Sequence, residues 1–370
     1  MRKFVQYIFF IGAVLHCLPA YAKVTVALIT PKAEEYKQQG DELEKGVKQA
    51  IDEINNNGGL LKEKIALLTI DDQCNDSIAV STAQMLSILK KRNIKLVIGP
   101  YCANAFDKIA DIYANAKIFQ IIPTTVNYSQ AKTIKKGLVK MLGYTNQQAI
   151  DFFKFYNERM AGKQLAVISN KDESESMAEA EAILQEFQKH GKASLTKLYT
   201  YDMTNNDYKK LAQKVLTGNN DMAFLLGTAK NIRKTAKALK SGNSNFVVFT
   251  NKYAATKQYF DYLDELADGT YFMELRGCTD DPNFAETLVK LRLSGIETEG
   301  LSLYGYEAIN LWKVLVEKAK SFEYNRVAAY VNDKNISTEF GNKMFHNGVP
   351  KASEPYAIYQ YNSGKYEKLY

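Results

Sequence analysis

The chain has 370 residues and a formal net charge of +7, with 46% hydrophobic and 24% charged residues. A chain of this length can bury two cores, which favours two domains over one. Basic and acidic residues are interspersed along the sequence, which argues against a nucleic-acid partner. The three histidines and four cysteines form neither Cys-x-x-Cys nor His-x-x-x-His, so we expect no metal site and no cofactor.

Residues 1–22 have the pattern of a signal peptide. Arg2 and Lys3 precede an apolar run of 15 residues, and the small-x-small triplet Ala20-Tyr21-Ala22 follows it. We therefore predict cleavage after Ala22 and export to the periplasm. An uncleaved anchor is disfavoured, because roughly 20 apolar residues are needed to span a bilayer. A lipoprotein is also disfavoured, because His16 occupies the position before Cys17 where a lipobox has a small residue.

Cleavage would remove Cys17 and leave Cys74, Cys102 and Cys278 in a compartment that permits oxidation. Two of the three can pair, and one is left over. Cleavage would also remove Arg2 and Lys3, so the net charge would fall to +5.

From Lys23 onward, short β-branched runs alternate with amphipathic helices, a pattern typical of parallel sheets covered on both faces. In the first series we predict strands over 23–30, 64–72, 94–100 and 118–126 and helices over 40–59, 77–93 and 104–116. A second series follows, with strands over 164–170, 194–202, 221–227 and 246–251 and helices over 147–162, 176–191, 206–218 and 231–242. The pattern therefore predicts two lobes.

After residue 270 the alternation is less regular. We predict a strand over 271–277, helices over 284–293 and 304–320, and hairpins with turns at 346–348 and 362–364. These helices need a sheet to cover and the last strands need partners. Returning the helices to the first lobe and the last hairpin to the second would take the chain between lobes three times.

The usual catalytic motifs are absent. No Gly-x-Gly-x-x-Gly follows the first strand, and neither a P-loop nor Gly-x-Ser-x-Gly occurs. His190, at a predicted helix end, and His346, at a predicted turn, are expected to be structural. Acidic pairs such as Asp71-Asp72 are expected on solvated faces or in helix first turns. These observations favour a binding protein over an enzyme.

Two segments carry a resemblance to a known family. "NNNGGLLKEKIALLTIDDQCND" and, after a helix, "IKLVIGPYCANAFDKIADIYANAKIFQIIPTTV" resemble the periplasmic leucine/isoleucine/valine-binding proteins, the solute receptors of branched-chain amino acid ABC transporters. The likeness is close over residues 23–130, looser to Asn251, and visible again in "LSLYGYEAINLW" and "EFGNKMFHNGVPK". It implies an α/β fold of periplasmic binding protein type I, with two doubly wound parallel-sheet lobes joined by three hinge crossovers around a ligand cleft.

The resemblance also implies a domain division and a disulfide. Lobe I would comprise residues 23–144 and 275–351, and lobe II residues 145–274 and 352–370. Cys74 and Cys102 would pair, since each follows a strand, and two adjacent parallel strands would bring the two cysteines within bridging distance. Cys278 would remain a lone thiol.

Ligands of parallel α/β sheets bind beyond the carboxyl ends of the strands. On this basis and on the resemblance, we expect the ligand to contact ten residues: Gln39, Tyr101, Ala103, Asn104, Thr124, Thr125, Thr145, Ser174, Thr228 and Lys252.

This set departs from the family's pattern for holding an amino acid. The carboxylate of the ligand is held in the family by a serine after the second cysteine, where this chain has Ala103, and by a threonine after the proline, where it has Thr124 and Thr125. In the family, acidic residues and a tyrosine of the second lobe and hinge hold the ammonium group of the ligand. Their positions correspond here to Thr145, Ser174, Thr228 and Lys252, although Asp172, Glu173 and Glu175 lie nearby. If Lys252 faced the cleft, it would repel an ammonium and favour a carboxylate, sulfonate or phosphate.

We therefore predict a monomeric periplasmic substrate-binding protein of an ABC importer, with a membrane permease as its partner. The ligand would be a branched-chain-type amino acid or a related small carboxylate or amide. A ligand-sensing receptor on the same fold is the first alternative, and an exported α/β enzyme is the second.

Overall fold

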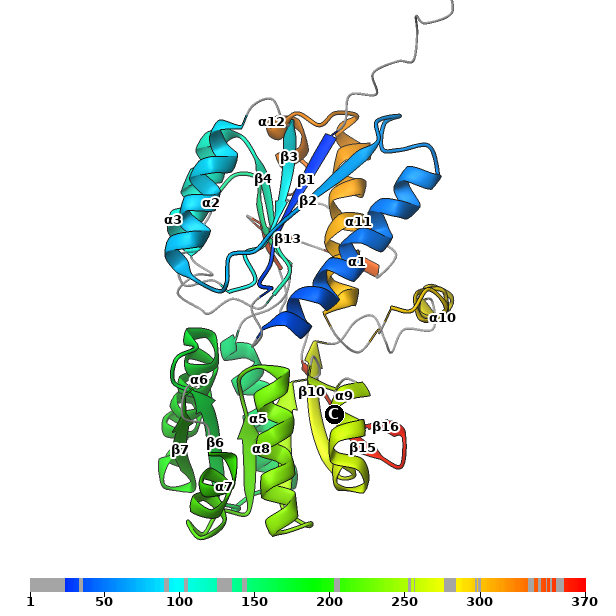
Figure 1. Ribbon diagram of the computed structural model, residues 1–370. Coiled ribbons are helices and arrows are strands. Elements are labelled where there is room, and N and C mark those ends of the chain that lie inside the picture. Colours follow the sequence, from blue (N-terminus) through cyan, green and yellow to red (C-terminus); the bar gives the residue numbers. More distant parts are fainter. Residues whose placement is uncertain are drawn as a thin grey trace, which may run out of the picture.

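The computed structural model describes residues 24–32, 36–89, 93–102, 106–124, 135–141, 145–202, 207–251, 254–255, 257–275, 284–296, 298, 301–331, 336–338, 341–343, 345–346, 348–350 and 356–370. Over this part of the chain the protein forms two α/β lobes, one above the other in Figure 1. Each lobe contains one main β-sheet with helices on both faces. The predicted signal peptide and its cleavage site lie outside the described residues.

The first sheet is parallel throughout, in the order β2-β1-β3-β4-β5. Its strands are β1 (Val24–Ile29), β2 (Ile65–Ile70), β3 (Ile94–Ile98), β4 (Phe119–Ile122) and β5 (Leu138–Lys140). All residues of β1 are buried, as expected for a central strand that helices cover on both sides.

Two pairs of helices cover this sheet. One face is covered by α1 (Lys37–Asn56) and α11 (Ser302–Ala319), to which α10 (Ala285–Leu293) and α12 (Tyr324–Ala328) add further apolar side chains. The other face is covered by α2 (Asp76–Ile88) and α3 (Phe106–Ala116). Helices α1 and α11 meet at two glycines: a Cβ on Gly46 would lie 1.7 Å from the Ser302 carbonyl oxygen, and one on Gly305 would lie 2.3 Å from the Leu43 carbonyl oxygen.

The second sheet has the order β16-β15-β10-β9-β8-β6-β7. Its parallel strands are β6 (Leu165–Asn170), β7 (Thr196–Tyr201), β8 (Met222–Leu225), β9 (Val247–Asn251) and β10 (Thr270–Leu275). The antiparallel strands β15 (Tyr356–Asn362) and β16 (Lys365–Lys368) extend it at one edge.

The helices of the second lobe also divide between two faces. Helices α5 (Thr145–Arg159) and α6 (Ser174–Lys189) cover one face, and α7 (Tyr208–Leu216), α8 (Ala229–Gly242) and α9 (Lys257–Leu263) cover the other. Two 3₁₀ turns, Ala193–Leu195 and Asp264–Ala267, complete this lobe.

The chain passes between the sheets three times: from β5 to α5, from β10 to the helices of the first lobe, and back to β15. Before the last passage it forms two small hairpins, β11 (Ile336–Thr338) with β12 (Gly341–Lys343) and β13 (Phe345–His346) with β14 (Val349–Pro350). The connecting residues 142–144, 276–283 and 351–355 lie outside the described residues. The division into lobes at 144/145, 274/275 and 351/352 therefore stays a prediction.

Most predicted elements are present, with different bounds. The first helix starts at Lys37 and not at Gly40, so Gln39 lies in the first turn of α1 and not in the preceding loop, where we expected it. Strand β5 and helices α9 and α12 were not predicted, because runs of three to seven residues are too short to show a periodicity. Both predicted hairpin turns are confirmed, between β13 and β14 and between β15 and β16.

Candidate functional site

The strand ends of the first lobe present buried polar atoms. The hydroxyl of Thr30 follows β1, that of Thr124 follows β4, and the amide oxygen of Gln39 lies in α1. All three residues are at most 5% exposed, and these three atoms have no hydrogen-bond partner within the described chain. Because buried polar atoms are rarely left without partners, they are candidates for contact with a ligand or water.

A disulfide between Cys74 and Cys102 lies beside these strand ends, with 5.1 Å between the two Cα atoms. The pairing is as predicted, but the geometric reason was wrong: β1 lies between β2 and β3, so the two strands are not adjacent. The bridge instead joins the loops that follow β2 and β3, beyond the end of β1.

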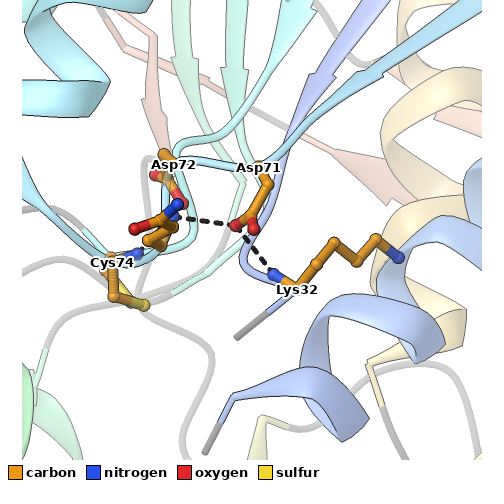
Figure 2. Close-up of a disulfide and its surroundings, with 6 residues drawn as sticks. Lys32, Asp71, Asp72 and Cys74 are labelled. Carbon is orange, nitrogen blue, oxygen red and sulfur yellow. Dashed lines mark hydrogen bonds between the residues drawn. A yellow bond between two sulfur atoms is a disulfide. The ribbon is translucent and has the colours of Figure 1, made fainter. Parts of the chain in front are cut away.

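Figure 2 shows the loop that holds Cys74. The Asp71 carboxylate accepts hydrogen bonds from the backbone N–H of Lys32 at 2.9 Å and of Gln73 at 2.8 Å, which ties the loop to the segment after β1. Asp72 accepts a bond from the backbone N–H of Cys74 at 3.3 Å. Its carboxyl group is fully buried, and burial raises its pKa to about 6, with smaller contributions from the charges of Asp71 and Asp76. The expectation of a solvated acidic pair is therefore wrong for Asp72.

The part of the second lobe that lies near these strand ends carries carboxylates. Helix α6 begins at Ser174 after β6, with Glu173 at the preceding position and Glu175 in its first turn. Glu179, one turn further on, is only 4% exposed and accepts a hydrogen bond from the Asn251 side-chain amide at 3.0 Å. Burial raises the pKa of Glu179 to about 7.

Tyr101 shows that the two sets of side chains lie close together. It belongs to the first lobe and is 6% exposed, and its pKa is raised well above the ordinary value. Burial is the main cause, and the charges of Glu175, Glu173 and Glu179 and the neighbouring Tyr36 phenol add to it. Hydroxyl groups of the first lobe thus lie within electrostatic range of carboxylates of the second lobe.

Two further side chains, those of Tyr356 and Arg233, lie where the lobes meet. The pKa of the Tyr356 phenol, at the start of β15, is raised by burial and by the charges of Glu179, Asp151 and Glu175. Its hydroxyl is buried without a hydrogen-bond partner in the described chain. An Nη1 atom of Arg233 in α8 donates to the side-chain oxygen of Gln38 in α1 at 3.1 Å, which connects the two lobes directly.

Four of the ten predicted ligand contacts can be examined in full. Gln39, Tyr101 and Thr124 are buried in the region described above. Thr228 is also buried, but its hydroxyl caps α8 by accepting from the backbone N–H of Asn231 at 3.3 Å. The remaining six stay predictions. Thr145 and Ser174 are the first residues of α5 and α6, but their side chains lie outside the description, as do the whole residues Ala103, Asn104, Thr125 and Lys252.

Sequence reasoning missed Tyr36, Glu179 and Tyr356, whereas it had named Glu173 and Glu175 as possible substitutes for the acidic ligands. The signal for Glu179 is its position among buried residues of the helix face that includes Ala180 and Ile183. His190 is structural as expected: it ends α6, contacts Glu186 and stacks on Phe153, with 4.3 Å between the ring centroids.

Within the described residues, no group of three or more histidine, cysteine or acidic side chains is suited to hold a metal ion. In the same residues, no helix is both long and apolar enough to cross a bilayer.

Two doubly wound lobes with polar strand ends that approach each other define the type I periplasmic binding fold. The chain belongs to the periplasmic binding protein family, whose pattern it matches over residues 23–365.

Individual proteins agree with this assignment. The chain is 24% identical to the Leu/Ile/Val-binding protein BraC3 of Rhizobium johnstonii over 351 residues, which cover 94% of each chain. It is also 24% identical to an amino acid binding protein of Pseudomonas aeruginosa, over 95% of this chain and 93% of the other.

Among solved structures, the leucine-binding protein LivK of Thermotoga maritima has a TM-score of 0.79 at 17% identity, over 94% of this chain and 98% of the other. A solute-binding protein of R. palustris in complex with benzoate has a TM-score of 0.80 at 15% identity, over 94% of this chain and 95% of the other. Likeness at this level of identity supports the fold and does not determine the ligand.

Proposed function

We propose that this protein is the periplasmic receptor of an ABC importer and that it binds one small amino acid between its lobes. Family membership supports a solute-binding role. The relatives named above are described as Leu/Ile/Val-binding or amino-acid-binding proteins. We further propose that the signal peptide is cleaved after Ala22, that the protein catalyses no reaction, and that it delivers its ligand to a membrane permease.

The choice of ligand rests on the different polar groups that the two lobes present to each other. Tyr101 and Thr124 present hydroxyl donors from the first lobe, whereas Glu173, Glu175 and Glu179 present carboxylates from the second. An amino acid has the complementary polarity, because its carboxylate accepts hydrogen bonds and its ammonium group donates them. We therefore propose that the carboxylate of the ligand lies toward Thr124 and that its ammonium group lies toward Glu179 and Tyr356.

The remaining expected contacts fit this proposal as secondary ones. For Gln39 we propose a contact to the same carboxylate from the first lobe. For Ala103, Asn104 and Thr125 we propose backbone or side-chain contacts to the same carboxylate, and for Thr145, Ser174 and Lys252 contacts from the second lobe. Thr228 we assign to helix capping, with at most a backbone contact to the ligand.

The test is the thermal shift of the mature protein with aliphatic amino acids, their amides and the matching carboxylic acids lacking the ammonium group. We expect stabilisation by the amino acids, because a ligand that binds only the folded state raises Tm. Acids without an ammonium group should give little shift. A larger shift with those acids than with the amino acids would contradict the proposal.

Substitutions on α6 sharpen this test. Glu179→Gln removes the buried negative charge, and we expect it to weaken amino-acid binding by at least about tenfold, because charged hydrogen bonds contribute about 1.5–3 kcal/mol. Glu181→Gln on the exposed face of the same helix is the matched control. Equal affinities of the two variants would show that the ammonium group of the ligand does not lie beside Glu179.

A further inference from the structure

Helices α7 and α8 carry eight lysine and arginine residues and no aspartate or glutamate. They pack side by side on one face of the second sheet, through an apolar stripe that includes Leu211, Val215 and Leu239. On the opposite face, α5 and α6 together carry six acidic residues against three basic ones. The positive charge of this lobe is therefore concentrated on one face, although it looks dispersed in the sequence.

Five of these cations have no carboxylate partner among the described residues: Lys209, Lys210, Lys214, Lys234 and Lys237. Lys240 does not belong to this surface, since it is 3% exposed and donates to the Asp268 carbonyl oxygen. We call the five lysines the α7–α8 basic surface. Neighbouring like charges raise the free energy of the isolated protein, and an acidic partner would relieve this repulsion.

Three lysines of the basic surface, Lys209, Lys234 and Lys237, line a hollow of about 620 Å³. Its walls also include Tyr208, Ser241, Tyr262 and one acidic residue, Asp207, whose carboxylate caps α7 by accepting from the Lys210 backbone N–H at 3.0 Å. The Lys234 ammonium lies 5.4 Å from the centroid of the Tyr208 ring, and that of Lys237 lies 4.5 Å from the centroid of the Tyr262 ring. Lys237 also donates to the Tyr262 carbonyl oxygen at 2.6 Å. These contacts hold two of the lysines in position before any partner arrives.

We propose that the α7–α8 basic surface is a docking site for an acidic segment of a protein partner. Charge complementarity favours a partner rich in aspartate and glutamate, and the tyrosines beside the lysines belong to a residue type that is enriched in protein interfaces. A recessed site with aromatic walls suits an inserted chain segment better than the flat surface of a bilayer. If the proposed transport function holds, this partner is an acidic extramembrane segment of the permease.

The position of the surface agrees with this role. Helix α8, which runs along the front of the lower lobe in Figure 1, also carries Arg233, whose side chain donates a hydrogen bond to Gln38 of the first lobe. A partner bound on α7 and α8 therefore contacts the helix that carries this hydrogen bond between the lobes.

The test is photo-crosslinking in intact cells that export the protein. A photoreactive residue replaces Ser241 in the hollow, in three backgrounds: wild type, the triple reversal Lys209→Glu, Lys234→Glu and Lys237→Glu, and the control reversal Lys62→Glu, Lys163→Glu and Lys365→Glu. The control changes the net charge equally at exposed positions outside α7 and α8. We expect a crosslink that mass spectrometry maps to an acidic protein segment, reduced at least tenfold in the triple reversal and retained in the control.

Other outcomes overturn the proposal. One is a crosslink that is insensitive to the triple reversal or maps to a segment without acidic residues. Another is sedimentation of the purified protein with vesicles of phosphatidylcholine and phosphatidylglycerol that is lost only in the triple reversal, because that would make the bilayer the partner. Ligand thermal shifts of all three proteins check folding and the proposed function independently, so a failure of docking and a failure of ligand binding are distinguishable.

Discussion

Burial controls the ionisation of two carboxyl groups, Asp72 and Glu179, and each gives a pH dependence. The pKa of Asp72 is raised to about 6 in the folded protein, against 3.8 as its ordinary value. The folded state therefore binds more protons than the unfolded state between about pH 4 and pH 6. Stability from this group is present below pH 4 and is lost as the pH rises through 6.

We expect Asp72→Asn to remove this dependence. The amide resembles the protonated carboxyl group and retains an oxygen that can accept from the Cys74 N–H. At pH 8 the variant should be more stable than the wild type by up to about 3 kcal/mol, since one pKa unit corresponds to 1.36 kcal/mol. Denaturant melts at pH 4 and pH 8 measure the difference. A wild-type stability that does not fall over this range would contradict the assignment.

Glu179 should make ligand affinity depend on pH. Burial raises its pKa to about 7 in the protein without ligand, where Tyr101, Tyr356, Glu175 and Asn251 surround it. An ammonium group favours the ionised carboxylate, so affinity should fall by up to tenfold per unit below pH 7. Calorimetry at pH 6 and pH 8 measures this change. It should disappear in Glu179→Gln and persist in Glu181→Gln.

The sequence could not distinguish Glu179 from the other three glutamates of α6, because burial depends on which face of the helix meets the sheet and the other lobe. Thr124 and Tyr101 could be named as candidates from the sequence, since they lie two and three residues beyond the ends of β4 and β3, and ligands of parallel sheets bind at this edge.

At the scale of elements, the contact between α1 and α11 depends on two glycines. A methyl group at Gly46 would meet the Ser302 carbonyl at 1.7 Å, a backbone atom that cannot move without displacing α11. We expect Gly46→Ala to destabilise the protein by at least about 2 kcal/mol through overpacking. In Gly242→Ala, the added methyl group meets only the end of the Leu216 side chain at 2.6 Å, and a higher helix propensity partly offsets this contact. Chemical denaturation of both variants tests the contrast, and equal stabilities would contradict it.

The disulfide joins two loops that 28 residues separate in the sequence. Closing a loop of this size restricts the unfolded chain by about 3–4 kcal/mol. We expect Cys74→Ser with Cys102→Ser to lose a stability of this order in oxidising buffer, while Cys278→Ser changes little. Denaturation of each variant with and without reductant measures the difference. A double variant as stable as the oxidised wild type would show that the disulfide does not contribute to the stability of the fold.

The alternation of strands and helices was sufficient to predict most elements, because long apolar periodicities depend on local sequence. It was not sufficient to order the strands. The wrong expectation that β2 and β3 are adjacent arose because the sheet places β1 between them, and strand order is a property of the crossover connections and not of any one segment.

At the scale of the whole molecule, the Arg233–Gln38 hydrogen bond connects the lobes directly. If ligand binding stabilises the arrangement in which this bond forms, Gln38→Ala should weaken ligand affinity by about three- to tenfold, the equivalent of one hydrogen bond of 0.5–1.5 kcal/mol. Calorimetry of the variant measures this, and the melting temperature without ligand should stay close to that of the wild type. Unchanged affinity would mean that the bond plays no part in closure.

The basic surface is also a property of the whole molecule. Its five lysines are spread over residues 209–237, where nothing in the sequence marks them as a group. Only the packing of two helices onto one sheet face brings their charges together.

Strands β15 and β16 complete the second sheet, and residues as late as Phe345 belong to the core of the first lobe. During synthesis, therefore, the core of the first lobe stays incomplete until residue 345 has been made, and the second sheet until residue 368. A polypeptide that must be threaded through a narrow channel benefits from such a delay, because premature folding would block its passage. Arrival of residues 345–368 on the far side would then let both lobes form almost together.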